Sequence, residues 1–88
     1  MNREEIYKEL IQTYGDIQII VAVEELSELQ KELCKALRSN GNRKNLIEEM
    51  ADVEIMLEQM KMYFLIEQEE IDKIKEQKIE RTKNRLLR

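Results

Sequence analysis

The sequence contains no histidine, no proline and no tryptophan, and it has a single cysteine, Cys34. Without histidine, a Ser-His-Asp triad, a histidine general base and a histidine-ligated metal are all excluded. A lone cysteine forms neither a disulfide within the chain nor a cysteine-rich zinc site. Any acid–base or metal chemistry must therefore depend on carboxylates, lysines, tyrosines or water.

Aromatic residues make up only 5% of the sequence, and the net charge is −4. Proteins that bind single-stranded nucleic acid need aromatic platforms and a positive surface, so we expect no nucleic-acid partner. The sequence also lacks an apolar run of membrane-spanning length and an N-terminal signal pattern. These absences predict no membrane partner and a cytoplasmic location.

What the sequence does contain favours helices. Glu, Lys, Leu, Ile, Met and Gln dominate, and most of these are good helix formers. A chain of 88 residues is at most one domain, here taken as residues 1–88. So short a chain buries only about 60% of the surface that its unfolded form exposes, so we expect it to associate with further copies of itself.

Hydrophobic spacing predicts three helices, over residues 2–14, from 17 to 38, and from 43 into the 60s. Gly15 is expected to end the first helix and Asp16 to cap the second.

A turn of Ser-Asn-Gly-Asn at 39–42 is expected to join the second and third helices into an antiparallel pair. A fourth helix is either continuous with the third or separated from it by a kink near 67–70. It would carry Ile71, Ile74, Ile79 and Leu86. The predicted fold is all-α, a helical bundle built on an antiparallel αα-hairpin and completed by oligomerisation.

Two pairs of acidic residues occupy matching positions on the second and third helices. Glu25 and Glu28 form one pair and Glu49 and Asp52 the other, and residues three apart lie on one face of a helix. Each pair stands in the same angular relation to the apolar stripe of its helix. We assign those stripes to Ala22, Leu26, Leu29 and Leu33, and to Leu46, Met50, Val53 and Leu57.

Glu28 and Asp52 lie at nearly equal distances from the turn at 39–42, so the four carboxylates are expected to converge. Converging carboxylates repel one another, and a hard divalent cation is the usual means of offsetting that repulsion. Oxygen ligands alone favour Mg²⁺, with Mn²⁺ as an alternative, and suit hydrolysis of a phosphoanhydride. Acidic pairs on solvated helix faces are the ordinary alternative, and the matched phase and height bring the two interpretations level.

The pattern Glu24-Glu25-x-x-Glu28, a spacer of helix-turn-helix length, and Glu49-x-x-Asp52 resembles the signature of the MazG-like all-α nucleoside triphosphate pyrophosphohydrolases. The resemblance covers residues 14–60. It implies a Mg²⁺-dependent enzyme that converts (deoxy)nucleoside triphosphates to the monophosphate and pyrophosphate. It further implies a homodimer or homotetramer. The metal-binding and catalytic carboxylates that it implies are Glu25, Glu28, Glu49 and Asp52.

Many members of that family carry Lys-x-x-x-Asn-x-x-Arg in their last helix, near the substrate phosphates. This chain has Lys78, Thr82 and Arg85 at that spacing, so the resemblance implies that Lys78 and Arg85 bind substrate. Thr82 replaces the asparagine, which weakens any transfer of base or sugar preference. A solvated helix end is an equally good account of both cations.

The rival functional hypothesis is a helical oligomerisation or regulatory module without catalysis, which would use its apolar stripes to bind a partner. The pattern does not select the nucleotide, the biological role, the general base, or dimer over tetramer.

Overall fold

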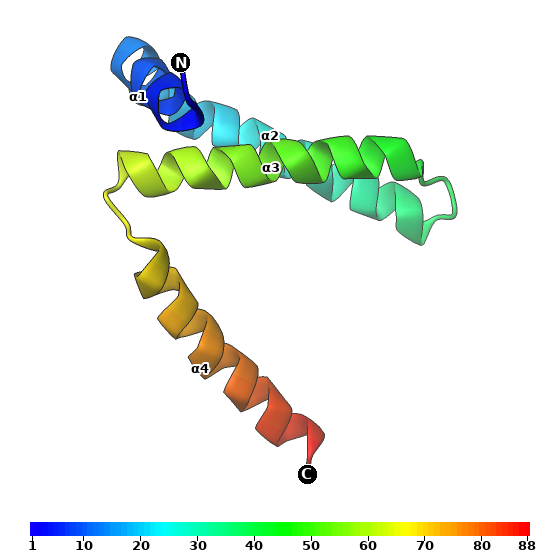
Figure 1. The fold of residues 1–88 in the computed structure, drawn as a ribbon. Helices are drawn as coiled ribbons and strands as arrows, with labels where there is room; N and C mark the ends of the chain where they lie inside the picture. Colours follow the sequence, from blue (N-terminus) through cyan, green and yellow to red (C-terminus); the bar gives the residue numbers. More distant parts are fainter.

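The computed structural model describes all residues, 1–88, and contains four helices and no strands, which confirms the predicted all-α class. Two of the helices form the hairpin, a short helix precedes it and a long one follows it (Figure 1). Their bounds are α1 Arg3–Tyr14, α2 Ile17–Leu37, α3 Arg43–Tyr63 and α4 Gln68–Leu86. The third and fourth helices are therefore separate. None of the helices is long and apolar enough to cross a membrane.

The helix ends follow local chemistry, with one departure from prediction. Asn2 and Asn42 cap α1 and α3, since each side chain accepts a hydrogen bond from a backbone N–H three residues on. Gly15 ends α1 at φ +53°, in the region that favours glycine. Asp16 stands at the start of α2, but it makes no capping hydrogen bond. Its carboxylate accepts a hydrogen bond from the Tyr63 hydroxyl instead, which ties the start of α2 to the end of α3.

The helices α2 and α3 lie antiparallel, and a buried amide pair sets their register. Gln18 Nε2 donates to Gln59 Oε1 at 2.8 Å, and both side chains are buried. The first helix packs across the open end of the hairpin, where the buried Tyr7 donates its hydroxyl to Glu58 (Figure 1). Side-chain hydrogen bonds therefore join the helices at the end of the hairpin opposite its turn.

The predicted apolar stripes are wrong in part. Ala22 and Val53 are buried where α2 meets α3, as expected, and so is Met56. Leu33 and Leu57, however, are about half exposed, at 49% and 52%. The two helices meet along the face that carries the acidic pairs, so the stripe lies on one flank of the contact and not at its centre.

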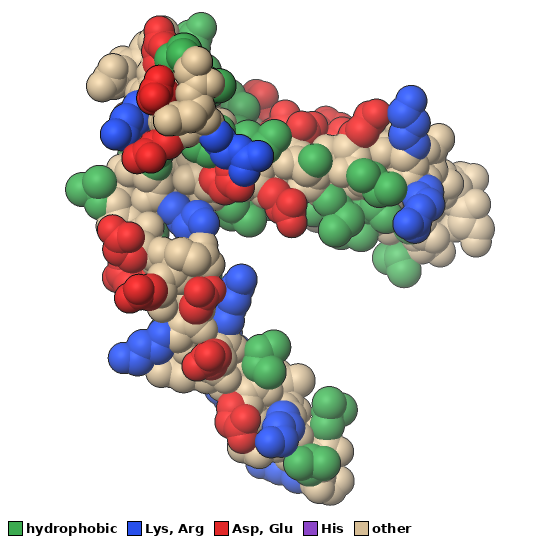
Figure 2. Space-filling view, in the orientation of Figure 1, with side chains coloured by type: hydrophobic (Ala, Val, Ile, Leu, Met, Phe, Trp, Pro, Cys, Tyr) green, Lys and Arg blue, Asp and Glu red, His purple; other side chains and the backbone are tan.

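The exposed flanks of the two helices form one surface. Leu33 lies about 80° around α2 from Glu25, and Leu57 lies about 80° around α3 from Glu49. Matched rotation on antiparallel helices places both on the same side of the hairpin. Hydrophobic side chains gather on the visible surface of the hairpin toward its turn (Figure 2). We call this surface the apolar face. It comprises Leu26, Leu33, Leu37, Met50 and Leu57.

The last helix, α4, leads away from the hairpin and buries no residue (Figure 1). Leu65 at φ +55° turns the chain, and a capping box between Glu67 and Glu70 starts the helix. The radius of gyration is 16.2 Å, against about 12 Å for a compact domain of this length. The accessible surface is 7429 Å², against about 5,500 Å² for a compact monomer of this mass.

Candidate metal centre

Three carboxylates from two helices converge in the seam of the hairpin. Glu25 comes from α2, and Glu49 and Asp52 come from successive turns of α3. Each offers one carboxylate oxygen, and these oxygens all lie within 4.8 Å of one another. All three residues are half-buried. We call this group the carboxylate cluster.

The register of the hairpin explains the convergence. Asp52 precedes Gln59 by about two helical turns, and Glu25 follows Gln18 by the same distance. Since Gln18 and Gln59 are hydrogen-bonded, Glu25 lies level with Asp52. The same count places Glu28 level with Glu49. The sequence placed Glu28 and Asp52 at the same level to within about one turn, and in this register they lie about one turn apart.

The surroundings of Glu25 disfavour its charge. Burial contributes most to raising its pKa above the ordinary value of 4.5, and the negative charge of Asp52 contributes next. Glu49 and Glu28 raise the pKa of Glu25 further. No lysine or arginine offsets these charges. The cluster therefore lacks a cation of its own.

The surroundings of Glu49 disfavour its charge in the same way. Burial raises its pKa first, followed by the charges of Asp52, Glu28, Glu32 and Glu48. Its Oε2 atom is buried and accepts no hydrogen bond. An unpaired buried oxygen is unfavourable, and a bound cation would supply the missing partner.

Glu28 differs from the other predicted ligands. Its side chain is exposed and lies outside the carboxylate cluster. Its charge nevertheless raises the pKa of both Glu25 and Glu49, so its carboxylate borders the cluster. Glu28 occupies the solvent side of the site.

Lys78 and Arg85 are exposed on α4. That helix does not pack along α2, and it runs away from the hairpin (Figure 1). Within one chain the structure does not bring these two cations to the carboxylate cluster.

Sequence reasoning missed Glu32, which is 8% exposed and has a buried Oε2 without a hydrogen-bond partner. A signal for it was present, because Glu32 follows Glu25 by seven residues and so lies within about 20° of it around α2. The Gln18–Gln59 pair was also missed, since it depends on a register that the sequence does not state.

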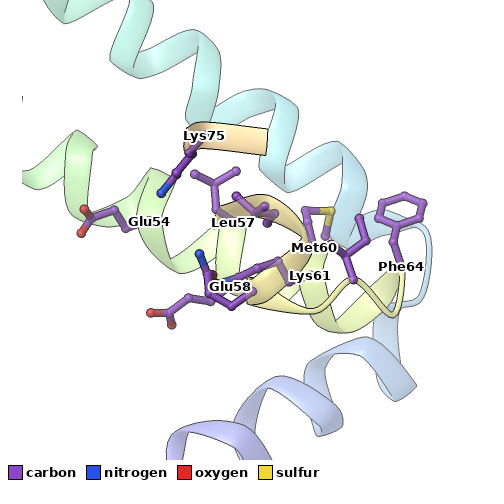
Figure 3. A pocket seen from close by; sticks show the side chains of 10 residues that line it. Glu54, Leu57, Glu58, Met60, Lys61, Phe64 and Lys75 are labelled. Carbon is purple, nitrogen blue, oxygen red and sulfur yellow. Dashed lines mark hydrogen bonds between the residues drawn. The ribbon is translucent and has the colours of Figure 1, made fainter. Parts of the chain in front are cut away.

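A separate cavity of about 580 Å³ lies between α3 and the start of α4 (Figure 3). None of the three clustered carboxylates lines it. Its wall is largely apolar and is bordered by charged side chains at Glu54, Glu58, Lys61 and Lys75. Its apolar lining residues are Leu57, Met60, Phe64, Ile66 and Ile71.

The donor set of the cluster is oxygen only, which fits Mg²⁺ or Mn²⁺ and does not fit metals that prefer nitrogen or sulfur. No family model, no curated protein and no solved structure matches this chain.

Proposed function

We propose that this chain is a Mg²⁺-dependent nucleoside triphosphate pyrophosphohydrolase that releases pyrophosphate and a nucleoside monophosphate. The observation that carries the proposal is the carboxylate cluster, with its oxygens within 4.8 Å of one another and no protein cation to offset them. The resemblance of Glu24-Glu25-x-x-Glu28 and Glu49-x-x-Asp52 to the MazG-like signature supports the same reaction.

In this proposal Glu25, Glu49 and Asp52 hold the metal, and Glu28 joins them by rotating its exposed side chain inward. Bound Mg²⁺ supplies Lewis-acid polarisation of the phosphate oxygens and a water of lowered pKa. Water attacks the α phosphorus, and the bond from that phosphorus to the oxygen bridging to the β phosphorus breaks. Glu25, Glu49 and Asp52 already lie close together in the seam, so little reorganisation of these three is needed as charge develops.

The proposal includes self-association as a homodimer or homotetramer. The isolated chain exposes about 1,900 Å² more than a compact monomer of its mass. That excess is of the size that obligate interfaces cover. In such an assembly the apolar face would be covered, and α4 of one chain would bring Lys78 and Arg85 toward the site of another. Those cations would then bind the phosphates of the nucleotide.

The direct test is pyrophosphate release from a panel of ribo- and deoxynucleoside triphosphates with Mg²⁺. We expect Mg²⁺-dependent turnover of at least one member of the panel. Absence of turnover on every nucleotide, from protein with an intact helical circular dichroism spectrum, would rule out the enzyme.

The second candidate function is a helical oligomerisation or regulatory module without catalysis. It is favoured by the apolar face and by the open cavity between α3 and α4, which suit a protein partner (Figure 3). Thermal melting with and without Mg²⁺ distinguishes the two. Binding to the native state alone stabilises by about 2.7 kcal/mol at a hundredfold excess over Kd. A module without a cation site would show no such shift.

A further inference from the structure

A cavity of about 340 Å³ lies at the turn end of the hairpin, between the last turns of α2 and the first turn of α3. Its walls include the apolar side chains of Ala36 on α2 and Leu46 on α3. Gly41 closes the turn against Ala36, since a Cβ at Gly41 would lie 3.1 Å from the Cα of Ala36. Two charged side chains of opposite sign also line the cavity, Glu32 and Arg43. The cavity therefore combines apolar walls with one hydrogen-bond acceptor and one donor.

The contacts of Glu32 leave part of its carboxylate unused. The side chain is 9% exposed, and its Oε1 meets Lys35 Nζ at 3.4 Å on the same helix. Its Oε2 is buried and accepts no hydrogen bond, and Arg43 forms no ion pair with it. A glutamate this buried normally has a partner for its charge. The last torsion of a glutamate is broad, so the carboxylate can turn both oxygens toward a ligand in the cavity.

The cavity lies a definite distance from the carboxylate cluster. Glu32 follows Glu25 by seven residues and lies within about 20° of it around α2, so about 10 Å separates them along one face. The register set by the Gln18–Gln59 hydrogen bond places Glu32 level with the first turn of α3. A nucleotide with its α phosphate at the cluster spans about this distance across its ribose to the far edge of its base.

The pairing of a carboxylate with a guanidinium selects among the bases. An ionised carboxylate only accepts hydrogen bonds, and guanine presents two adjacent donors, N1–H and the 2-amino group. Adenine and cytosine place a ring-nitrogen acceptor beside their amino group. Uracil and thymine flank their single N–H with carbonyl oxygens, so all four would repel one carboxylate oxygen. Guanine also presents O6 beside N1–H, and arginine donates well to that oxygen.

We propose that the cavity at the turn binds the guanine base of the nucleotide substrate. Glu32 accepts hydrogen bonds from N1–H and the 2-amino group, Arg43 donates to O6, and Ala36 and Leu46 lie against the base. This inference rests on the proposed function, and it names the substrate as a guanosine or deoxyguanosine triphosphate.

The test is calorimetric binding of guanosine, adenosine, cytidine, uridine and xanthosine monophosphates with Mg²⁺, since these carry the base without a phosphoanhydride. For the natural chain we expect the guanosine nucleotide to bind about ten- to a hundredfold more tightly than the other four. Glu32→Gln keeps the shape of the side chain but offers one acceptor and one donor. That pair complements xanthine, which has a carbonyl in place of the 2-amino group, so the preference should move from guanine to xanthine.

Lys35→Met is the matched control, because it removes the ion-pair partner of Glu32 and Lys35 does not line the cavity. It should keep the preference for guanine. Equal loss of that preference in Lys35→Met and Glu32→Gln would show that Glu32 acts through its ion pair and would overturn the proposed contact. Weaker binding of every base by Glu32→Gln, without a gain for xanthine, would overturn it as well.

The remaining outcomes separate the base site from the proposed enzyme. A preference for the guanosine nucleotide, without pyrophosphate release from any triphosphate, would retain the base site and reject the enzyme. Pyrophosphate release with equal kcat/KM for all bases, and no preference in binding, would overturn the base site and retain the enzyme. Neither binding nor pyrophosphate release from any nucleotide would overturn both.

Discussion

The hairpin and α4 are both long helical segments rich in charge, yet the chain uses them in opposite ways. In the hairpin, charged and amide side chains are turned into the contact between α2 and α3, where Glu32, Gln18 and Gln59 are buried. On α4 every charged side chain faces solvent, and no residue is buried. The seam of the hairpin gathers acidic side chains, while the second half of α4 is basic.

The difference shows which functions one chain can complete by itself. A cation centre needs carboxylates held at fixed separations, and the register of α2 against α3 supplies that within a single chain. The proposed phosphate binding by α4 needs a surface for the rest of that helix to pack against, because only its start lies beside its own hairpin. Ile74, Ile79 and Leu86 are exposed along it. We therefore expect changes in the hairpin to affect metal binding, and changes in α4 to affect substrate binding alone.

The largest effect is expected from Glu49→Gln. Loss of this carboxylate should lower Mg²⁺-dependent pyrophosphate release by at least about a hundredfold, because transition-state charge stabilisation depends on a correctly held metal. The same substitution should raise the melting temperature of the metal-free protein, since it removes a negative charge that Asp52, Glu28 and Glu32 repel. Steady-state kinetics and circular dichroism melting in a chelator measure the two effects.

Glu24→Gln is the control for this experiment, because Glu24 is exposed and its charge is not among those that act on Glu25 or Glu49. It should leave activity and melting temperature close to those of the natural chain. A Glu49→Gln protein that melts lower without metal than the natural chain would instead indicate a structural role for Glu49.

A smaller effect is expected from Lys78→Met on α4. Loss of a charged hydrogen bond to phosphate should raise KM by about ten- to a hundredfold, while the Mg²⁺-induced shift in melting temperature stays unchanged. Lys73→Met is the matched control on the opposite side of α4 and should leave KM as it was. Equal effects from both substitutions would show that Lys78 acts only through the overall positive charge of α4 and not through a specific contact with phosphate.

The sequence predicted the helices because their signals are local. Asn42 is the last residue of the turn at 39–42 and precedes an apolar stripe, and its side chain caps α3. The convergence of Glu25 with Glu49 and Asp52 was also predictable from helical spacing and distance to the turn. These are properties of one helix or of two helices joined by a short loop.

The sequence did not predict which face of α2 is turned toward α3. On each helix two neighbouring faces, the apolar stripe and the face with the acidic pair, were candidates for the contact. Burying Leu33 and Leu57 on each other would have followed the hydrophobic pattern. The chain instead buries Gln18 against Gln59, which leaves those leucines half exposed and draws Glu32 inward. That choice depends on specific side-chain hydrogen bonds and on what covers the apolar face, and neither is encoded in periodicity.

The apolar face gives a prediction about assembly. Leu33→Ala should weaken self-association by about tenfold, because removal of a half-exposed leucine from an interface costs about 1.4 kcal/mol of burial. Sedimentation velocity over a range of concentrations measures this. Cys34→Ala, one position along and about 100° round the helix, is the control and should associate as before. A natural chain that sediments as a monomer at every concentration would refute the assembly.

The smallest expected effect is a dependence of stability on pH that reverses sign when metal is added. The pKa values of Glu25 and Glu49 in the folded chain lie above the ordinary 4.5, so the folded state holds their protons more tightly than the unfolded state does. Their contribution to stability is therefore fully present below pH 4.5 and is lost as pH rises through the raised folded pKa values. With Mg²⁺ the opposite holds, because coordination requires deprotonated carboxylates and strengthens with pH.

Melting temperatures measured across the carboxylate range, in a chelator and in Mg²⁺, test this reversal. Exposed ion pairs elsewhere in the chain contribute a common background, so the informative quantity is the difference between the natural chain and Glu49→Gln. In a chelator that difference should widen as pH rises, with Glu49→Gln the more stable protein. If the two curves run parallel, the seam does not disfavour the Glu49 charge. The acidic residues of the hairpin would then affect stability as little as the solvent-exposed acidic residues of α4.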